Sequence, residues 1–375
     1  MLDRALLTQQ ILSSTQPFLA RRGQQLELAL QIWARMASDP EVYLQVLRHK
    51  FSLGLPIWSQ DLNFGQVQSL VNPGLLDYTV VACDGSQIYP DRHAGTNCYL
   101  INIGQSILRY SSTLEHSSSA SFANQPYFFT DLNGATPAAE LVDSHRHSLE
   151  MQVGLQVTIA EQALAKRLIY LIDGSLIAWH LEGKSPQLQA EFLPKYLQQL
   201  TQFEQLGVPS VGYISLPNSR ELINLLGAYQ ANFVTGSINQ TALELLTDAD
   251  LLWELLQPGE YLGWFVSGVV AAQVYPEALR PYFVYLHTGQ EIARVEFPAW
   301  VIAQPALFEL CLQVVFDQVV KGQGYPVALA EAHMQAVVKT HDKQFFYSLL
   351  QQVSERHGQT LTSSRKSAQK RVMNI

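Results

Sequence analysis

A short apolar run that ends in Asp-Gly-Ser occurs twice in this chain and constrains its fold more than any other feature. The first copy covers residues 79–86 and carries Asp84; the second covers residues 168–176 and carries Asp173. Four or more consecutive apolar or β-branched residues are typical of a strand that is covered on both faces. The glycine after each aspartate lets the chain turn without a Cβ penalty. The pattern therefore predicts two carboxylates held at neighbouring strand ends.

Each Asp-Gly-Ser taken alone is an ordinary turn signal, because Gly and Ser favour turns for their own conformational reasons. Two copies after apolar strands shift the balance towards a functional pair. Two carboxylates that are held close together repel each other unless a cation lies between them. The repeated motif thus indicates a divalent-metal site, and with it chemistry on phosphate groups.

The composition allows one large domain or two ordinary ones with a sizeable core. The chain has 375 residues, of which 47% are hydrophobic and only 15% are charged. The net charge of −8 does not indicate a nucleic-acid-binding protein, although a binding groove needs only local positive charge. Charge is uneven, since the stretch from Lys339 to the end holds seven Lys or Arg against Asp342 and Glu355.

The three cysteines fit neither a zinc site nor a disulfide framework by their spacing; they are Cys83, Cys98 and Cys311. They favour a reducing, intracellular compartment. The N-terminal stretch lacks the apolar core of a signal peptide. The longest uncharged apolar run, residues 263–274, is too short to span a bilayer. We expect a soluble cytoplasmic protein without membrane contact.

The order of periodic segments predicts an α/β fold with a mixed sheet. Residues 1–50 read as helical. A β-hairpin is expected where residues 98–103 and 106–110 flank Gly104-Gln105. A long loop follows over residues 111–135, and then a long helix from Thr136-Pro137 to about residue 166. Strands and helices are then expected to alternate. A strand ends at Asp173, a helix covers residues 187–206, and a strand covers residues 208–215. Residues 217–260 are mainly helical, strands lie within 261–274, 282–287 and 292–297, and helices cover 306–321 and 327–339.

Glu150 lies on the predicted long helix, and Gly154 is one turn later on the same face. A glycine there would let the helix approach the sheet and bring Glu150 towards the strand ends. The alternative is a solvated carboxylate paired with Arg146, which lies four residues earlier. Glu140 and Glu115 compete for the role of a third acidic ligand.

Five short motifs in this order resemble the NurA nuclease family, and among its members a bacterial, cyanobacterial one. The motifs span about residues 75–340, and each of them is weak alone. They are Asp84-Gly85-Ser86, the Arg146/Glu150 pair, residues 171–176, residues 294–298, and Gly324-Tyr325-Pro326 followed by Ala332-His333. One departure is Leu216 after Ser215, where the family often carries Lys.

The resemblance implies an RNase H-like core with a mixed five-stranded sheet flanked by helices, plus an N-terminal helical extension and an inserted α+β segment. The expected domains are the extension at 1–70, the nuclease domain at 71–345 with the insertion at about 217–300, and a C-terminal helix end with a basic tail at 346–375. The resemblance also implies a homodimer that works with a HerA-type hexameric ATPase.

The implied activity is a manganese-dependent DNA nuclease that processes double-strand break ends, as a 5′–3′ exonuclease with single-strand endonuclease activity, by a two-metal mechanism. Mg²⁺ is the alternative ion. Asp84, Glu150, Asp173 and His333 would hold the metal, because Mn²⁺ accepts a nitrogen ligand beside carboxylates. Tyr325 would orient phosphate or water, and His333 would move protons. Without the family, Tyr325 and His333 would read as a packed aromatic and a surface histidine.

Contacts to single- or double-stranded DNA ends would come from basic groups near the site. The candidates are Arg92, Arg146 and Arg220, and in the tail Arg365, Lys366, Lys370 and Arg371. Two other functions stay open. One is a catalytically weak or inactive nuclease-like module that binds a HerA-type ATPase or DNA, and the other is a metal-dependent phosphodiesterase acting on small nucleotides.

Overall fold

The computed structural model describes residues 2–58, 64–70, 77–91, 97–111, 118–130, 138–165, 167–234 and 240–357. The chain divides into two compact units. The first unit consists of residues 1–73, 174–177 and 212–324, and the second consists of 74–173, 178–211 and 325–375. The predicted boundaries at 70, 217–300 and 345 remain a prediction.

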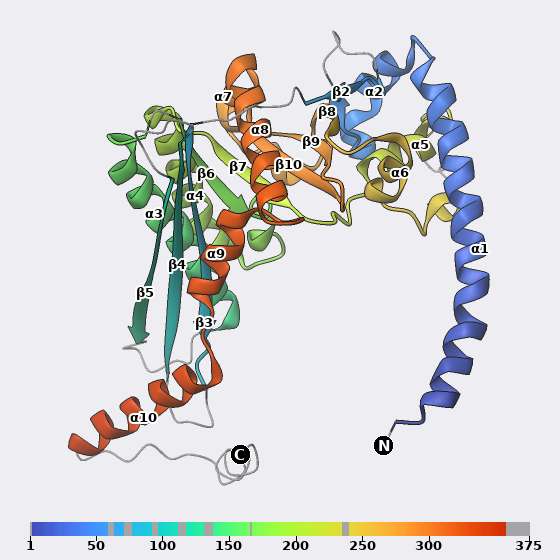
Figure 1. The fold of residues 1–375 in the computed structure, drawn as a ribbon. Coiled ribbons are helices and arrows are strands. Elements are labelled where there is room, and N and C mark those ends of the chain that lie inside the picture. The colour runs from blue at the N-terminus through green and yellow to red at the C-terminus, as the bar shows by residue number, and fades with distance from the viewer. Residues whose placement is uncertain are drawn as a thin grey trace. The chain divides into compact units, whose positions relative to one another are not determined.

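The second unit is built on the sheet order β5-β4-β3-β6-β7. Strands β3, β4 and β5 are antiparallel neighbours, whereas β6 pairs with the other edge of β3 in parallel. Three antiparallel strands, followed by one parallel to the first and another beyond it, are the arrangement of an RNase H-like core. The predicted fold class, mixed α/β with an RNase H-like sheet, is confirmed. Figure 1 shows the three long strands side by side.

The second unit contains five strands, of which β7 is shared with the first unit, and four α-helices among its described residues. They are β3 (Tyr78–Ile88), β4 (Cys98–Tyr110), β5 (Ser119–Thr130), α3 (Ala139–Gln162), β6 (Leu168–Asp173), α4 (Pro186–Leu206), β7 (Ser210–Ile214), α9 (Val327–Ala336) and α10 (Thr340–Arg356).

The predicted hairpin around Gly104 is wrong, because β4 runs unbroken through it and pairs with β3 along its length. Gly104 is there for another reason. A Cβ at Gly104 would lie 2.2 Å from the carbonyl oxygen of Ala332 and 2.3 Å from the backbone nitrogen of Ala336. The glycine therefore admits the backbone of α9 onto the sheet and does not mark a turn.

The predicted loop over residues 111–135 is also wrong in part, because residues 119–130 form β5. This strand lacks the apolar alternation expected of a half-buried strand, and nearly all of its residues are exposed. Its register with β4 is supplied by the neighbouring strand and not by its own pattern. The predicted long helix exists as α3, whereas the expected start at Thr136-Pro137 lies outside the described residues.

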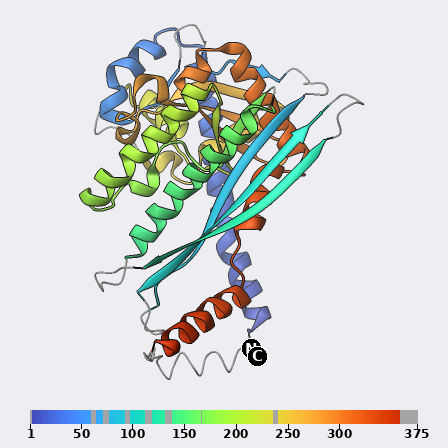
Figure 2. The same cartoon turned by 90° about the vertical axis from the view of Figure 1, so that its left-hand side faces the viewer.

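The two faces of β3 carry different helices, as Figure 2 shows for α3 and α4 on one side of the long strands. A Cβ at Gly85 would meet side chains of α3, whereas the Ser86 hydroxyl donates to the carbonyl of Ala336 in α9. Side chains alternate across a strand. Asp84 therefore faces α9 together with Ser86, and Gly85 faces α3.

Gly154 lets α3 lie close to β6, as predicted. A Cβ there would lie 2.2 Å from the hydroxyl oxygen of Tyr170, and that hydroxyl donates to the carbonyl of Glu150 at 3.2 Å. The Tyr170 ring in turn stacks on Phe203 of α4, with centroids 4.8 Å apart. These contacts fix the height of Glu150 along the sheet.

The first unit contains helices and an antiparallel sheet, with strand order β1-β8-β9-β10-β7 and β2 beside β8. Its helices and strands are α1 (Arg4–Ala37), α2 (Val42–Leu53), β1 (Ile57–Trp58), β2 (Val67–Ser69), α5 (Glu221–Gln230), α6 (Asp248–Leu255), β8 (Glu260–Val266), β9 (Pro281–His287), β10 (Ile292–Pro298), α7 (Ala299–Ile302) and α8 (Pro305–Lys321). Short 3-10 helices lie at Gln240–Leu243, Val270–Ala272 and Glu277–Leu279. The second unit also has a 3-10 helix, at Trp179–Leu181.

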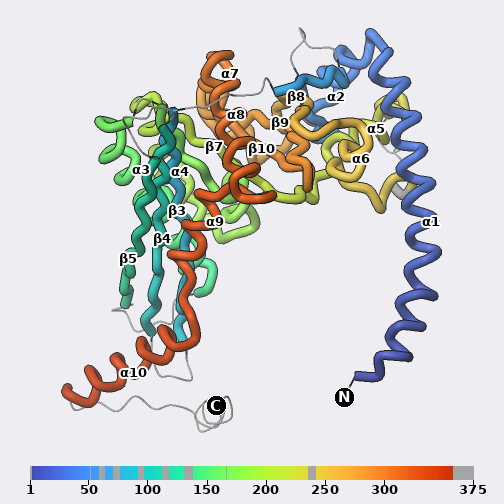
Figure 3. The backbone as a smooth tube through the Cα atoms, in the orientation of Figure 1, coloured from blue at the N-terminus to red at the C-terminus, as the bar shows by residue number. Residues whose placement is uncertain are grey.

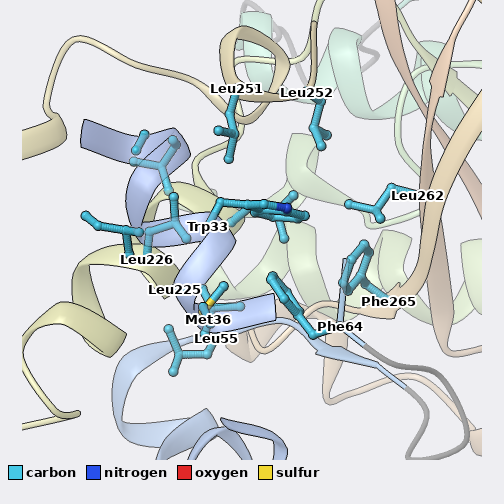
Figure 4. Packing of buried hydrophobic residues seen from close by; sticks show 14 of the residues in the cluster. Trp33, Met36, Leu55, Phe64, Leu225, Leu226, Leu251, Leu252, Leu262 and Phe265 are labelled. Atoms are coloured by element: carbon cyan, nitrogen blue, oxygen red, sulfur yellow. The ribbon is translucent and has the colours of Figure 1, made fainter. Parts of the chain in front are cut away.

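The core of the first unit forms where the C-terminal half of α1 packs against α5, α6 and the sheet. Figure 4 shows Trp33 and Met36 of α1 among leucines of α5 and α6, with Phe64 and Phe265 nearby. Figure 3 traces α1 as one continuous helix. No helix in the described part of the chain has the length and apolar character needed to cross a membrane.

Candidate metal and phosphodiester site

Asp84 and Asp173 lie on two neighbouring parallel strands, Asp173 as the last residue of β6 and Asp84 within β3, which continues to Ile88. The predicted strand end and turn at Asp84 are therefore wrong, because Gly85 and Ser86 stay paired with β4. The register pairs Ala82 with Leu171, and two further residues along each strand bring Asp84 opposite Asp173 on the same face. The Asp84 carboxylate acts electrostatically on Asp173. The predicted convergence of the two Asp-Gly-Ser strands is therefore present in the fold.

The carboxyl group of Asp173 is crowded by acidic neighbours, although the residue as a whole is exposed. Desolvation by surrounding atoms is the main cause that raises its pKa, and the charges of Asp84 and Glu150 add to the rise. A hydrogen bond from Tyr325 and the charge of His333 act in the opposite direction.

Glu150 reaches this site past Gly85. A Cβ at Gly85 would lie only 2.6 Å from Glu150 Oε1 and 2.7 Å from Arg146 Cγ. Since Gly85 directly follows Asp84, its missing side chain opens the space that a carboxylate from the α3 face occupies. The glycine of the first Asp-Gly-Ser motif is thus part of the site.

His333 comes from α9 and binds Asp84 directly. Its Nδ1 lies 2.8 Å from Asp84 Oδ2, and the backbone N–H of Gly85 donates to Asp84 Oδ1 at 2.8 Å. Gly104 is the cross-strand partner of Asp84. The same glycine that admits α9 therefore sets the height of His333 above Asp84.

The five residues that the sequence predicts for catalysis and metal binding all lie in the second unit, where Asp84, Glu150, Tyr325 and His333 each act on the carboxyl group of Asp173. Their catalytic and metal-binding roles stay a prediction. Of the two competitors for Glu150, only Glu140 is described, and it is not among the groups that act on Asp173. Glu140 lies in the first turn of α3, and Glu115 lies outside the described residues.

The arginines that the sequence predicts to contact DNA have different surroundings. Arg146 binds Glu150 and donates to the carbonyl of Gly85 at 3.3 Å. The Arg220 guanidinium donates to the carbonyls of Leu243 and Glu244, each at 2.9 Å. Arg92 and the basic tail lie outside the described residues. The proposed DNA contacts of these arginines stay a prediction.

The donor types fit a hard divalent cation, because the charges of two carboxylates and one imidazole, those of Asp84, Glu150 and His333, act on the carboxyl group of Asp173. Within the described ranges, however, no three acidic, histidine or cysteine side chains are already arranged as ligands of one ion. Glu150 directs Oε1 to Arg146 and Oε2 to His147. Sequence reasoning missed His147, since a histidine next to Arg146 carries no motif of its own.

Residues 294–298, another of the resembling segments, contribute structure in the first unit. Arg294 Nε donates to Glu296 Oε1 at 2.8 Å, and Arg294 Nη1 lies 3.3 Å from Glu221 Oε1. Glu296 Oε2 accepts from the backbone of Leu176 at 2.7 Å and from the hydroxyl of Ser175 at 2.8 Å. This buried network explains why an Arg and a Glu occupy β10.

A family model for the NurA domain matches residues 78–338. Among solved structures, the NurA nuclease from Sulfolobus solfataricus is 14% identical over 76% of this chain and 86% of its own, with a TM-score of 0.49. A NurA structure with manganese is 12% identical over 75% and 91%, with a TM-score of 0.40. A NurA structure bound to dAMP and manganese is 12% identical over 80% and 90%, with a TM-score of 0.34. No curated protein matches the chain.

Proposed function

Because the NurA-domain match spans well over half of it, the chain belongs to the NurA family, and we propose from this premise that it is a metal-dependent nuclease acting on DNA. The observation that carries the proposal is that the charges of Asp84, Glu150 and His333 all act on the Asp173 carboxyl group, with His333 bound to Asp84. A purely structural sheet gains nothing from carboxylates within electrostatic range of one another, since like charges raise one another's cost of ionisation.

Asp84, Asp173 and Glu150 would supply oxygen ligands, and His333 a nitrogen ligand. This mixed set favours Mn²⁺, with Mg²⁺ as the alternative. A bound divalent cation would neutralise the carboxylates and polarise a phosphodiester. Tyr325 donates to Asp173 and so keeps that carboxylate in its ionised, accepting form.

His333 is suited to moving a proton. Its Nδ1 contacts Asp84, while 63% of its side chain is exposed to solvent. An imidazole with one nitrogen on a carboxylate and a ring open to water can pass a proton between the site and the solvent near neutral pH.

Finer features of the activity follow from the family alone. We propose a 5′–3′ exonuclease with single-strand endonuclease activity that processes double-strand break ends by a two-metal mechanism, in cooperation with a HerA-type ATPase. A cytoplasmic place of action agrees with three free, buried cysteines.

A homodimer is proposed on the N-terminal half of α1. All described residues from 2 to 21 are exposed, and residues 5–20 contain no charged side chain. Ile11 and Phe18 stand at seven-residue spacing from Gln25 and Ile32, which are core positions of the same helix. Seven residues fall only about 20° short of two helical turns, so the buried face continues into solvent. An uncharged apolar face fits the core of an interface with a second copy.

The decisive test of the proposed activity uses the purified chain with Mn²⁺ and linear DNA. Asp84→Ala and Asp173→Ala should each abolish nucleotide release while the circular dichroism spectrum is unchanged, and Glu27→Ala, at an exposed position of α1, should behave as wild type. Unchanged cleavage by either site variant would refute the site. A chromogenic phosphodiester assayed in parallel separates a DNA nuclease from a small-nucleotide phosphodiesterase.

A further inference from the structure

We propose that His147 is a positioning residue that holds Glu150 in the site through a closed ring of hydrogen bonds with Arg146. This inference rests on the proposed function, because it assigns Glu150 its task as a ligand. The three residues lie on one turn of α3 and bind each other pairwise. The polar contacts of His147 are to Glu150 and Arg146, so it acts on the site through Glu150.

The ring of bonds fixes which nitrogen of His147 carries the proton. Arg146 Nη2 lies 3.0 Å from His147 Nε2, and a guanidinium has only donors. Nε2 must therefore accept. Nδ1 then carries the hydrogen and donates to Glu150 Oε2 at 3.1 Å. Arg146 Nη1 donates to Glu150 Oε1, which closes the ring.

These hydrogen bonds orient both carboxylate oxygens of Glu150, yet each oxygen keeps a lone pair that can bind a cation. A carboxylate offers about four lone-pair directions, and the ring takes one on each oxygen. One direction per oxygen remains for a cation. Hydrogen bonds of this kind to a ligating carboxylate fix its orientation in metal sites.

Glu150 needs a positioning partner more than Asp84 or Asp173 does. The two aspartates are placed by their strands, whereas Glu150 arrives on a long side chain from the opposite face, past Gly85. The rotamer freedom of a glutamate costs free energy to fix. Arg146 is itself anchored to the carbonyl of Gly85, so the ring ties Glu150 to the backbone next to Asp84.

The imidazole of His180 packs against the imidazole of His147. The two imidazoles stack with centroids 4.2 Å apart and planes inclined by 26°. Burial, with a smaller effect of the Arg146 charge, lowers the pKa of His180 to about 3, so its ring is neutral at pH 7. A flat neutral ring at this distance restricts the rotation of His147.

The test is a calorimetric titration of Mn²⁺ into the full-length chain without DNA. His147→Ala should weaken Mn²⁺ binding about 10–100-fold, the usual effect of losing a partner that orients a ligand. His147→Asn places an amide N–H near the position of Nδ1 and should bind close to wild type. His147→Gln places its amide near Nε2 instead and should behave like His147→Ala. His341→Ala, an exposed histidine on α10, is the matched control.

A double-variant cycle separates positioning from general support of the fold. In Glu150→Gln protein, removal of His147 should change the Mn²⁺ affinity no further, because the carboxylate that it positions is gone. Wild-type affinity in His147→Ala, equal affinities of the Asn and Gln variants, or a full effect in the Glu150→Gln background would each overturn the inference. A wild-type chain that neither binds Mn²⁺ nor cleaves DNA overturns the proposed function itself, and this inference with it.

Discussion

His333 Nδ1 lies 2.8 Å from Asp84 Oδ2, although 249 positions of sequence separate the two residues. The contact depends on two glycines with opposite tasks. Gly104, across the strand from Asp84, admits the backbone of α9 on one face. Gly85 admits the side chains of Arg146 and Glu150 on the other face. The consequences of filling these two spaces should differ.

Gly104→Ala should destabilise the protein and impair catalysis together. The new Cβ would collide with backbone atoms of Ala332 and Ala336, which cannot move without displacing α9. Overpacking of this kind costs about 1–3 kcal/mol of unfolding free energy. Displacement of His333 should lower the rate of DNA cleavage by about 10²–10⁴, the usual contribution of a proton-transfer group. Urea denaturation and nuclease assays measure the two effects. A variant of wild-type stability would show that α9 does not rest on Gly104.

Gly85→Ala should cost less stability than Gly104→Ala and still remove Mn²⁺ binding. Here the Cβ meets side-chain atoms of Glu150 and Arg146 and no backbone, so the two side chains can move without displacing a helix. This movement takes Glu150 out of the site. Calorimetry measures the Mn²⁺ affinity, and a thermal melt measures the stability. Gly23→Ala, where a Cβ meets open space, is the control; retained Mn²⁺ affinity in the Gly85 variant contradicts the role of Glu150.

The buried Asp248 in the first unit should make stability depend on pH. Burial raises the pKa of Asp248 from 3.8 to about 6, although Tyr285 and the backbone of Ile223 donate to its carboxylate. An acid with a raised pKa in the folded state stabilises the fold fully below about pH 3.8 and loses that contribution as pH rises through about 6. The difference corresponds to about 3 kcal/mol.

Asp248→Asn should abolish this component. The difference in unfolding free energy between the variant and wild type should therefore shift in favour of the variant by about 3 kcal/mol between pH 4 and pH 7. Urea denaturation at both pH values measures it, and Glu27→Gln, at an exposed position of α1, serves as the control. A difference that is the same at both pH values would mean that Asp248 titrates normally.

Charges on the exposed stripe of α1 should separate the proposed dimer. Ile11→Asp and Phe18→Asp each remove an apolar side chain whose full burial stabilises by about 1.5–3 kcal/mol, so dimerisation should weaken about 10–100-fold. Gln9→Asp, on the opposite side of the helix, adds the same charge and should leave the dimer intact. Sedimentation velocity distinguishes the species. A wild-type monomer at micromolar concentration, or Asp variants that dimerise normally, would remove the support for this interface.

The sequence alone determined the parts of the site that local patterns encode. Apolar runs followed by Asp-Gly-Ser located Asp84 and Asp173 on two strands, although β3 continues past Asp84 to Ile88, and helical periodicity located the helices that carry Glu150 and His333. The order of the motifs was sufficient to identify the family. Strand ends and helix faces follow from residue periodicity, which needs no knowledge of distant segments.

Only the tertiary structure decided why the glycines are where they are and which groups surround Glu150. Gly104 reads locally as a turn, yet it lies in mid-strand because α9, far along the chain, needs its missing side chain. The polar residues of β5 become a strand because β4 offers unpaired backbone groups. His147 gains its task from the approach of α3 to Gly85. Each of these depends on contacts between segments distant in sequence, and no local propensity carries that information.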